Sequence, residues 1–385
     1  MSIKLYHPQW GSRLTGTIIE LERLREEKLM GTVPPYIFFQ LKEIFHMLES
    51  LGSARIEGNH TTLAELVEQV IENKPKESQD EKMTEIHNID RAIKFLESFV
   101  DETTHFDRAF FSELHKILME GLKPAPAGEG SRFPGILRPV NVSIQGSGHK
   151  PPDHVKVPEY FQELMDFVNQ PMETQFHLLA IALSHHQMAW IHPFDNGNGR
   201  LVRLFTYAFL IKQGFQVKRG GILNPTAVFC MDRNKYYEML ALADTQEEEK
   251  VLEWCLFVLD GLRIEIEKID RLLDLNYTVS TILIPMLNDA LDRQHLTQVE
   301  FDILVKIVKS EDMQIKSADL EAVIGKESSV QRSRILRRLK DKGMIRPIKD
   351  GGRIYTIGFS NNYLLRDIMK VLEKNSFIPS SLNSN

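Results

Sequence analysis

One stretch of the chain, residues 191–203, combines residue types that could move a proton beside a bound phosphate. It holds a histidine, an asparagine flanked by glycines, and two arginines three residues apart. Backbone N–H groups at a helix N-terminus, made accessible by glycines, form a nest for anions. An imidazole beside such a nest can take a proton from a nearby hydroxyl. The pattern therefore predicts an anion site with His192 as its general base.

The flanking segments predict where these residues lie. Apolar residues recur at helical spacing over 176–191 and again over 200–213. His192 would therefore end one helix, and Arg200 and Arg203 would share one face of the next helix's first turn. Each residue taken alone also fits a plain turn, or a histidine that offsets a helix dipole.

The whole string resembles the Fic-family motif, His-x-Phe-x-Asp/Glu-Gly-Asn-Gly-Arg-x-x-Arg. Every fixed position matches except the acidic one, where this chain has Asn196 and where the family usually has a magnesium ligand. Asp195 fills the preceding variable position. The resemblance covers about residues 81–261 and implies a mainly α fold, a Fic helical bundle with a β-hairpin flap. It leaves open whether Asn196 binds Mg²⁺.

The resemblance also implies a reaction, the transfer of AMP from ATP to a Ser, Thr or Tyr hydroxyl of a target protein, including the chain itself. His192 would deprotonate the incoming hydroxyl, and Arg203 would hold the γ-phosphate. Two tyrosines lie in a segment similar to the family's nucleotide pocket, although alone they fit ordinary half-buried aromatics. The residues implied in binding ATP and its phosphates are Asn196, Gly197, Asn198, Gly199, Arg200, Arg203, Tyr236 and Tyr237.

The segment 128–152 departs from the helical pattern because it is rich in Gly, Pro and Ser. Val140, Val142 and Ile144 alternate with polar residues before a glycine turn, which predicts a β-hairpin. A surface loop without a role is the alternative. In Fic proteins a hairpin flap in this place pairs with an extended target segment. The flap residues implied here are Gly148 and His149.

A second short string, residues 53–59, resembles the Fic inhibitory signature Ser/Thr-x-x-x-Glu-Gly/Asn. If it is helical, Ser53 and Glu57 share a face. The resemblance implies that Glu57 pairs with Arg203 and removes this arginine from the γ-phosphate. The alternative is a surface glutamate that ends a helix before a glycine C-cap.

Composition bounds the remaining possibilities. The 385 residues suggest two or three domains, and 42% hydrophobic with 26% charged residues is ordinary for a soluble protein. No apolar run is long enough for a bilayer, and residues 1–10 lack a signal-peptide pattern. The two cysteines, Cys230 and Cys255, fit small core residues. We expect a cytoplasmic protein with no membrane partner.

Charge is unevenly distributed along the chain. Residues 326–353 hold ten Lys/Arg against three Asp/Glu, a charge of +7, whereas the whole chain carries −6. Short helices precede a basic helix at 328–342, and a hairpin follows it. This order predicts a winged helix-turn-helix that binds duplex DNA. A protein-binding role is the alternative. The candidate DNA contacts are Arg332, Arg334, Arg337 and Arg338.

The sequence thus predicts five regions. Two other functions stay open: a DNA-binding regulator whose Fic domain senses nucleotide, and a Fic enzyme that removes AMP or moves another phosphate-containing group. Neither the target nor the choice between monomer and homodimer follows from the sequence. The expected regions are an N-terminal helical region with the inhibitory segment (1–80), a Fic core (81–261), connecting helices (262–295), a winged helix (296–360) and a tail (361–385) that is disordered after 375.

Overall fold

The computed structural model describes residues 3–26, 32–72, 80–144, 148–215, 225–320, 329–349, 351–379 and 382. These residues are mainly helical, as expected. None of the described helices combines the length and apolar character needed to cross a membrane. Some predicted features lie outside the described residues: most of the polar loop at 74–81, the flap turn at 145–147, the end of a helix at 317–324, Gly325 and Lys326, Asp350 in the wing, and most of 380–385.

The chain forms two compact units. Residues 1–80, expected as one N-terminal region, contribute to both. Unit 1 contains Met1–Lys28, Glu49–Thr61 and Lys76–Glu267, and unit 2 contains Leu29–Leu48, Thr62–Pro75 and Lys268–Asn385.

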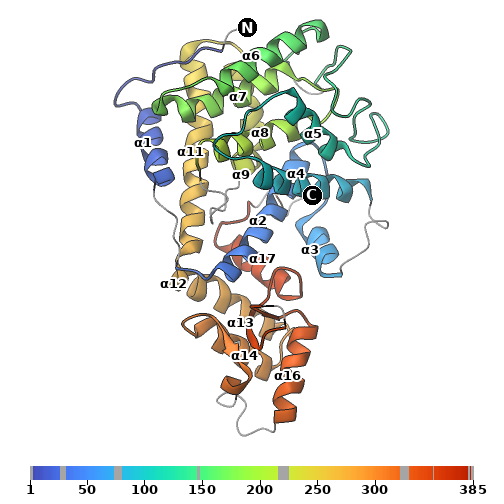
Figure 1. Ribbon diagram of the computed structural model, residues 1–385, viewed down its shortest axis with the longest axis vertical. Helices are drawn as coiled ribbons and strands as arrows, with labels where there is room; N and C mark the ends of the chain where they lie inside the picture. Colours follow the sequence, from blue (N-terminus) through green and yellow to red (C-terminus); the bar gives the residue numbers. More distant parts are fainter. Residues whose placement is uncertain are drawn as a thin grey trace. The chain divides into compact units, whose positions relative to one another are not determined.

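Unit 1 is built around two long helices, α7 (His177–Ile191) and α8 (Asn198–Lys212), which pack side by side (Figure 1). Its other elements are α1 (Arg13–Glu26), the end of α2 (Pro35–Ile56), α4 (Glu81–Phe99), α5 (Arg108–Met119), η2 (His154–Lys156), α6 (Val157–Asn169), η3 (Thr174–Phe176), α9 (Pro225–Cys230), α10 (Arg233–Ala243) and most of α11 (Glu248–Leu273).

Burial explains why α7 and α8 form the centre of unit 1. Nearly every side chain of α7 is buried, which is the pattern of a helix surrounded by others. Helices α4, α5 and α8 pack on one another, with Phe111 and Phe205 in edge-to-face contact between α5 and α8. The aspartates Asp80 and Asp107 cap α4 and α5 by accepting backbone N–H bonds. The loop between α7 and α8 is therefore held by a packed core.

Unit 2 combines helices with a small antiparallel sheet. Its strands have the order β1-β3-β2, with Ile315 opposite Tyr355 and Ile345 opposite Ile357. Its elements are the start of α2, α3 (Leu63–Glu72), α12 (Leu275–Tyr277), the π-helical turn η5 (Thr278–Leu283), α13 (Ile284–Asp292), α14 (Gln298–Lys309), β1 (Ile315–Lys316), η6 (Ser317–Leu320), α16 (Ser329–Asp341), β2 (Ile345–Pro347), β3 (Ile354–Ile357) and α17 (Leu364–Lys374).

The expected flap hairpin is not formed, because the described residues between 128 and 152 contain no strand. Instead, the buried Arg138 side chain connects the segments before and after the expected turn, the two flap arms. Its Nη1 donates to the Val140 carbonyl at 3.1 Å, and its Nη2 donates to the Pro152 carbonyl. The guanidinium thus donates hydrogen bonds to carbonyls of both arms, whereas a β-hairpin would connect them by a ladder of backbone hydrogen bonds. The alternating valines predicted the pairing wrongly.

The C-terminal region also differs from the prediction of a tail that is disordered after residue 375. Helix α17 occupies much of it, and its apolar residues repeat at helical spacing on a buried face. Beyond the helix, Phe377 and Ile378 are buried, with the Arg271 guanidinium 5.6 Å from the centre of the Phe377 ring. Burial of these two side chains orders the segment after the helix.

Candidate functional site

The motif loop, residues 192–197, connects α7 to α8 through two left-handed residues. His192 caps α7 with φ 51°, and Gly197 precedes α8 with φ 75°. The left-handed conformation of Gly197 disfavours a larger residue, and a Cβ there would lie 2.5 Å from the Met119 methyl carbon, so the Met119 side chain would have to move. The loop therefore presents the N-terminus of α8 beside the His192 side chain.

The Asn198 amide closes this loop. Its Oδ1 accepts the Phe194 N–H at 2.9 Å, and its Nδ2 donates to the Phe194 carbonyl at 2.8 Å. Oδ1 and one Nδ2–H are thus used inside the loop, and the expected contact of this amide with phosphate stays a prediction. The first turn of α8 also offers an anion its backbone N–H groups.

His115 on α5 packs against the motif loop, and its role was not predicted from the sequence. Its ring stacks on the buried Phe194 ring, with centroids 3.9 Å apart. Its Nδ1 accepts the Gly135 N–H at 2.9 Å, which leaves Nε2 protonated to donate to the Asn196 carbonyl at 3.0 Å. Burial lowers the pKa of His115 to about 4, so the ring is neutral at pH 7.

The loop fits a magnesium ion poorly. The side-chain Oδ1 of Asn196 accepts the Gly197 N–H at 2.7 Å, and its Nδ2 donates to the Gly130 carbonyl at 3.2 Å. Asp195, the neighbouring carboxylate, accepts the Ser131 hydroxyl and the Arg132 N–H. Magnesium usually binds through carboxylates and phosphates, and the one carboxylate in this loop already fastens it to residues 131–132.

The electrostatic surroundings of His192 suit a base. Burial lowers the pKa of His192 to about 4, although the Ala189 carbonyl and Glu57 oppose this shift. At pH 7 the imidazole is therefore neutral and able to accept a proton. Its backbone carbonyl accepts the Arg138 Nε–H at 2.8 Å, so the arginine that joins the flap arms also holds the end of α7.

Glu57 occupies the predicted anion nest. A Cβ on Gly199 would stand 2.0 Å from Glu57 Oε1, so the carboxylate lies directly against the first turn of α8. The same oxygen accepts the Arg203 Nη2–H at 2.7 Å. Burial would raise the pKa of Glu57, but the charges of Arg203 and Arg200 outweigh burial and lower it. The residue is therefore an anion at neutral pH.

Ser53 completes the grip on Arg203. Its hydroxyl accepts the Arg203 Nε–H and its carbonyl accepts an Nη2–H, each at 2.9 Å. Because α2 continues to Ile56, Ser53 lies on this helix one turn before Glu57. The guanidinium is 1% exposed, so the predicted γ-phosphate ligand is taken up by the predicted inhibitory segment.

Arg200 is also held within unit 1. Its Nη1 lies 2.8 Å from Glu85 Oε1 on α4, and its Nη2 donates to the Glu129 carbonyl at 2.8 Å. Neither Glu85 nor Glu129 belongs to a motif. Nothing in the sequence around either residue indicates that it contacts Arg200. Glu85 was therefore missed by reasoning from the sequence.

The two tyrosines expected to line a nucleotide pocket differ in position. Tyr236 is buried, and its hydroxyl lies 2.9 Å from His185 Nε2, whose ring in turn contacts the Thr206 hydroxyl. Burial raises the pKa of Tyr236. Tyr237 is 40% exposed, beneath the Arg233 guanidinium. A nucleotide contact thus stays a prediction for both, and Tyr237 is the accessible one.

The flap end is anchored to α7 and α10 through His149. Its Nε2 contacts the Trp190 carbonyl at 3.0 Å, and its Nδ1 lies 3.1 Å from Asp244 Oδ2. Burial lowers the pKa of His149, but its bonds to Asp244 and Trp190 give a net rise. His186 contacts the other Asp244 oxygen at 2.8 Å. His149 thus fastens the end of the flap to Trp190 and Asp244. Gly148 beside it is exposed.

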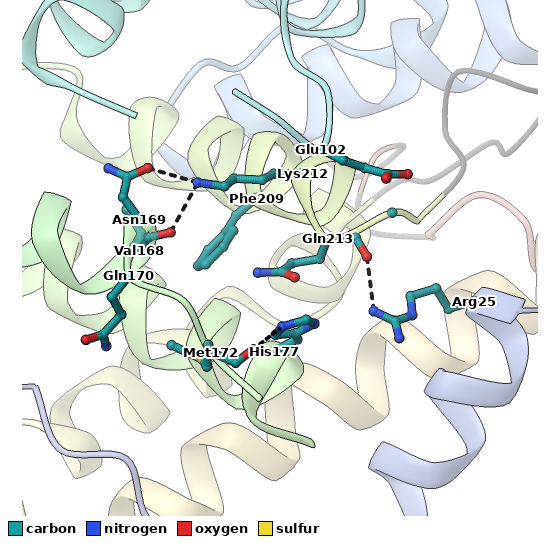
Figure 2. A pocket seen from close by; sticks show the side chains of 11 residues that line it. Arg25, Glu102, Val168, Asn169, Gln170, Met172, His177, Phe209, Lys212 and Gln213 are labelled. Atoms are coloured by element: carbon teal, nitrogen blue, oxygen red, sulfur yellow. Dashed lines mark hydrogen bonds between the residues drawn. The ribbon is translucent and has the colours of Figure 1, made fainter. Parts of the chain in front are cut away.

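A polar cavity of about 580 Å³ opens at the opposite ends of α7 and α8 (Figure 2). It is lined by His177 and Lys212 and contains no residue of either motif. Lys212 donates to Asn169 Oδ1 at 2.8 Å, and Arg25 donates to the Gln213 carbonyl at 3.2 Å (Figure 2). Its cations are thus engaged with neighbouring groups, and the cavity is separate from the site described above.

In unit 2 the four candidate DNA-binding arginines divide into two kinds. Arg334 and Arg337 are exposed on α16. Arg332 is half-buried, and Arg338 donates to the buried Glu300 carboxylate at 3.0 Å. Arg338 is therefore partly neutralised by a buried carboxylate, whereas Arg334 and Arg337 face solvent and Arg337 is 3.8 Å from the exposed Asp341 carboxylate.

Part of unit 1 is similar to a known protein family. Residues 105–210, from before α5 almost to the end of α8, match the Fic/DOC family. Helix α2 and the whole of unit 2 lie outside the matched range.

Curated proteins that are similar to about half of this chain carry the name protein adenylyltransferase Fic. Those from Drosophila willistoni and Drosophila virilis are each 28% identical over 204 residues, which is 52% of this chain. The matches cover 36% and 37% of those proteins, so most of each relative has no counterpart in the alignment.

Solved structures share the fold. A Fic family protein from Desulfovibrio desulfuricans G20 superposes with a TM-score of 0.52 at 20% identity, over 91% of this chain and 98% of that one. A Fic domain containing signaling protein from Bacteroides thetaiotaomicron gives 0.50 at 17% identity, over 69% and 97%. At these identities the likeness concerns the fold alone.

Proposed function

We propose that this chain is a protein adenylyltransferase that moves AMP from ATP to a hydroxyl side chain of a target protein, and that Glu57 inhibits it. The observation that carries the proposal is the Glu57 carboxylate, which lies against the first turn of α8 and pairs with Arg203. A carboxylate in this place marks an anion-binding nest beside a neutral histidine.

The proposed reaction assigns each group one step. His192 takes the proton of the incoming hydroxyl, whose oxygen bonds to the α-phosphorus of ATP as the bond to the β-phosphate breaks. Pyrophosphate leaves, and Arg200 offsets its developing charge. The N–H groups of the first turn of α8 bind phosphate oxygens. Magnesium, when bound to ATP, would neutralise phosphate charge, although Asn196 and Asp195 fit this ion poorly.

Inhibition follows from competition for one arginine. Arg203 cannot bind a γ-phosphate while its Nε and Nη2 donate to Ser53 and Glu57. The Glu57 carboxylate also adds negative charge where phosphates would bind, and like charges at this spacing repel. ATP would then bind with its α-phosphate misaligned, and transfer would be slow.

The test is self-labelling with ATP that carries a label on its α-phosphate. The Glu57→Gly variant should take up label well above the wild type, because Arg203 and the nest become available together. Label on the γ-phosphate should not be transferred, which separates AMP transfer from phosphate transfer. Equal labelling of the variant and the wild type would contradict inhibition by Glu57, and no labelling of either would favour a nucleotide sensor.

A second candidate function rests on unit 2. We propose that α14, α16 and the β1-β3-β2 sheet form a winged helix that binds duplex DNA, because Arg334 and Arg337 are exposed on α16. Such a helix enters the major groove and the strand hairpin touches backbone phosphates. Fluorescence anisotropy of labelled duplex DNA with the full chain tests this. Binding should weaken with salt, and no binding at low salt would favour a protein-contact role.

A further inference from the structure

Glu85, on α4, belongs to no motif, yet its carboxylate is buried beside the first arginine of the Fic motif. Glu85 Oε1 lies 2.8 Å from Arg200 Nη1, and the two side chains are 3% and 1% exposed. A second carboxylate that forms an ion pair with this guanidinium, Glu129, is 4.0 Å away and 52% exposed. Because water screens an exposed charge far more than a buried one, Glu85 is the stronger partner of Arg200.

Asn59 fixes the orientation of Glu85. Its Nδ2 donates to Glu85 Oε2 at 2.8 Å and to the Lys82 carbonyl at 2.9 Å, and its Oδ1 accepts the Thr61 N–H at 2.9 Å. Every polar atom of the amide is thus used. Asn59 stands two residues after Glu57, so the turn that ends the inhibitory helix is fastened to α4 at the residue that holds Arg200.

The guanidinium retains capacity for an anion. Nε and Nη1 of Arg200 are buried and make no hydrogen bond of good geometry with described residues, so the Glu85 contact is one of charge and proximity. Nη2 lies 3.6 Å from where a Cβ on Gly197 would stand, at the turn into α8. Nη2 carries two N–H groups and donates one to the Glu129 carbonyl, so its other N–H can be taken by a phosphate oxygen that arrives at this turn.

We propose that Glu85 is a positioning residue: it holds the Arg200 guanidinium at the N-terminus of α8 for the phosphates of ATP, and Asn59 sets the carboxylate's orientation. This inference rests on the proposed function. An arginine side chain has many rotamers, and a phosphate contact requires one of them. A fixed buried carboxylate selects that rotamer before ATP arrives, which lowers the entropic cost of binding.

The experiment is a double-mutant cycle in the Glu57→Gly parent, with Glu85→Gln, Arg200→Gln and both together. The readouts are kcat and KM for AMP transfer and the Kd for ATP from calorimetry. Glu85→Gln should lower kcat/KM by about 10- to 100-fold, the size expected when a catalytic contact moves by about 1 Å. Added to Arg200→Gln, it should change nothing further. Asn59→Ala should act in the same direction and by less.

Two outcomes overturn the inference: an unchanged kcat/KM for Glu85→Gln, or effects of Glu85 and Arg200 that multiply in the double variant. Thermal unfolding of each variant shows whether it folds. If Glu85→Gln does not fold, Glu85→Asp replaces it in the cycle, since it keeps the charge and shortens the reach. A reduced kcat/KM at an unchanged melting temperature supports positioning.

The same cycle separates this inference from the proposed function. A Glu57→Gly parent that binds ATP without transferring AMP contradicts the transfer reaction alone. The ATP Kd values of the four proteins then decide about Glu85: non-additive changes support its action through Arg200, and additive changes overturn it. A parent that binds no ATP at all would overturn both.

Discussion

Replacement of His115 by glutamine tests how the motif loop is held. In the wild type the folded-state pKa of His115 is about 4, against 6.5 for the free side chain. A depressed histidine pKa means that the folded state binds fewer protons than the unfolded state as the pH falls. The His115 contribution is therefore fully present above pH 6.5 and is lost as the pH falls toward 4.

The magnitude follows from these two values. Between pH 7 and pH 5 the unfolded chain gains most of a proton at His115 and the folded protein gains almost none. This difference removes about 2 kcal/mol from the free energy of unfolding of unit 1. Glutamine can accept the Gly135 N–H and donate to the Asn196 carbonyl without titrating. His115→Gln should therefore lose about 2 kcal/mol less than the wild type over this pH range.

Tryptophan fluorescence during urea unfolding is the assay. The three tryptophans, Trp10, Trp190 and Trp254, all lie in unit 1, so the signal reports this unit. The other buried histidines titrate in both proteins and cancel in the comparison. If the wild type and the variant show the same pH dependence, His115 is not the neutral, buried support that its contacts indicate.

Two further predictions concern Asn196 and the DNA-binding helix. In a Glu57→Gly background, Asn196→Asp should lower the Mg²⁺ concentration needed for half-maximal AMP transfer, because a carboxylate binds this ion better than an amide oxygen; superimposable Mg²⁺ titrations would show that this position does not govern the metal. Replacing Arg334 and Arg337 by alanine should reduce the salt dependence of duplex DNA binding by about two counterions. Arg338→Ala is the matched control and should have a smaller effect, since this side chain is bonded to a buried carboxylate; equal losses would mean that α16 does not dock by its exposed face.

The parts of the site that lie within one stretch of sequence were predictable. His192, the glycine turn and the two arginines lie within residues 192–203. The apolar periodicity on either side of them predicted the two helices. The contact between Glu57 and Arg203 joins residues 146 positions apart. Only the resemblance of residues 53–59 to a known signature suggested this contact. The structure contains the contact, and its effect on activity stays a prediction.

Supporting residues were missed because their partners are distant in the chain and nothing in the local pattern marks them. His115 and Glu85 each sit on an ordinary amphipathic helix and act on residues 81 and 115 positions away, respectively. The missed helix α17 is different. Leu364, Ile368 and Leu372 repeat at helical spacing, so a periodicity count would have found it.

The flap shows a limit of pattern reasoning. Alternating apolar residues predict a strand only when a partner strand supplies backbone bonds. Here Arg138 supplies side-chain donors to both arms, and its position in the sequence does not reveal that. A charged residue buried at 2% exposure can thus decide the local structure.

The central claim is that His192 transfers the hydroxyl proton during AMP transfer and that Glu57 prevents this reaction. It is tested most directly by measuring the AMP-transfer rate and the ATP Kd of Glu57→Gly and of Glu57→Gly with His192→Ala. Removing a general base costs about 100- to 10,000-fold in rate, and the ATP Kd should stay within about two-fold because the imidazole holds no phosphate in this account. A double variant that transfers AMP within a few-fold of the Glu57→Gly rate would contradict the assignment.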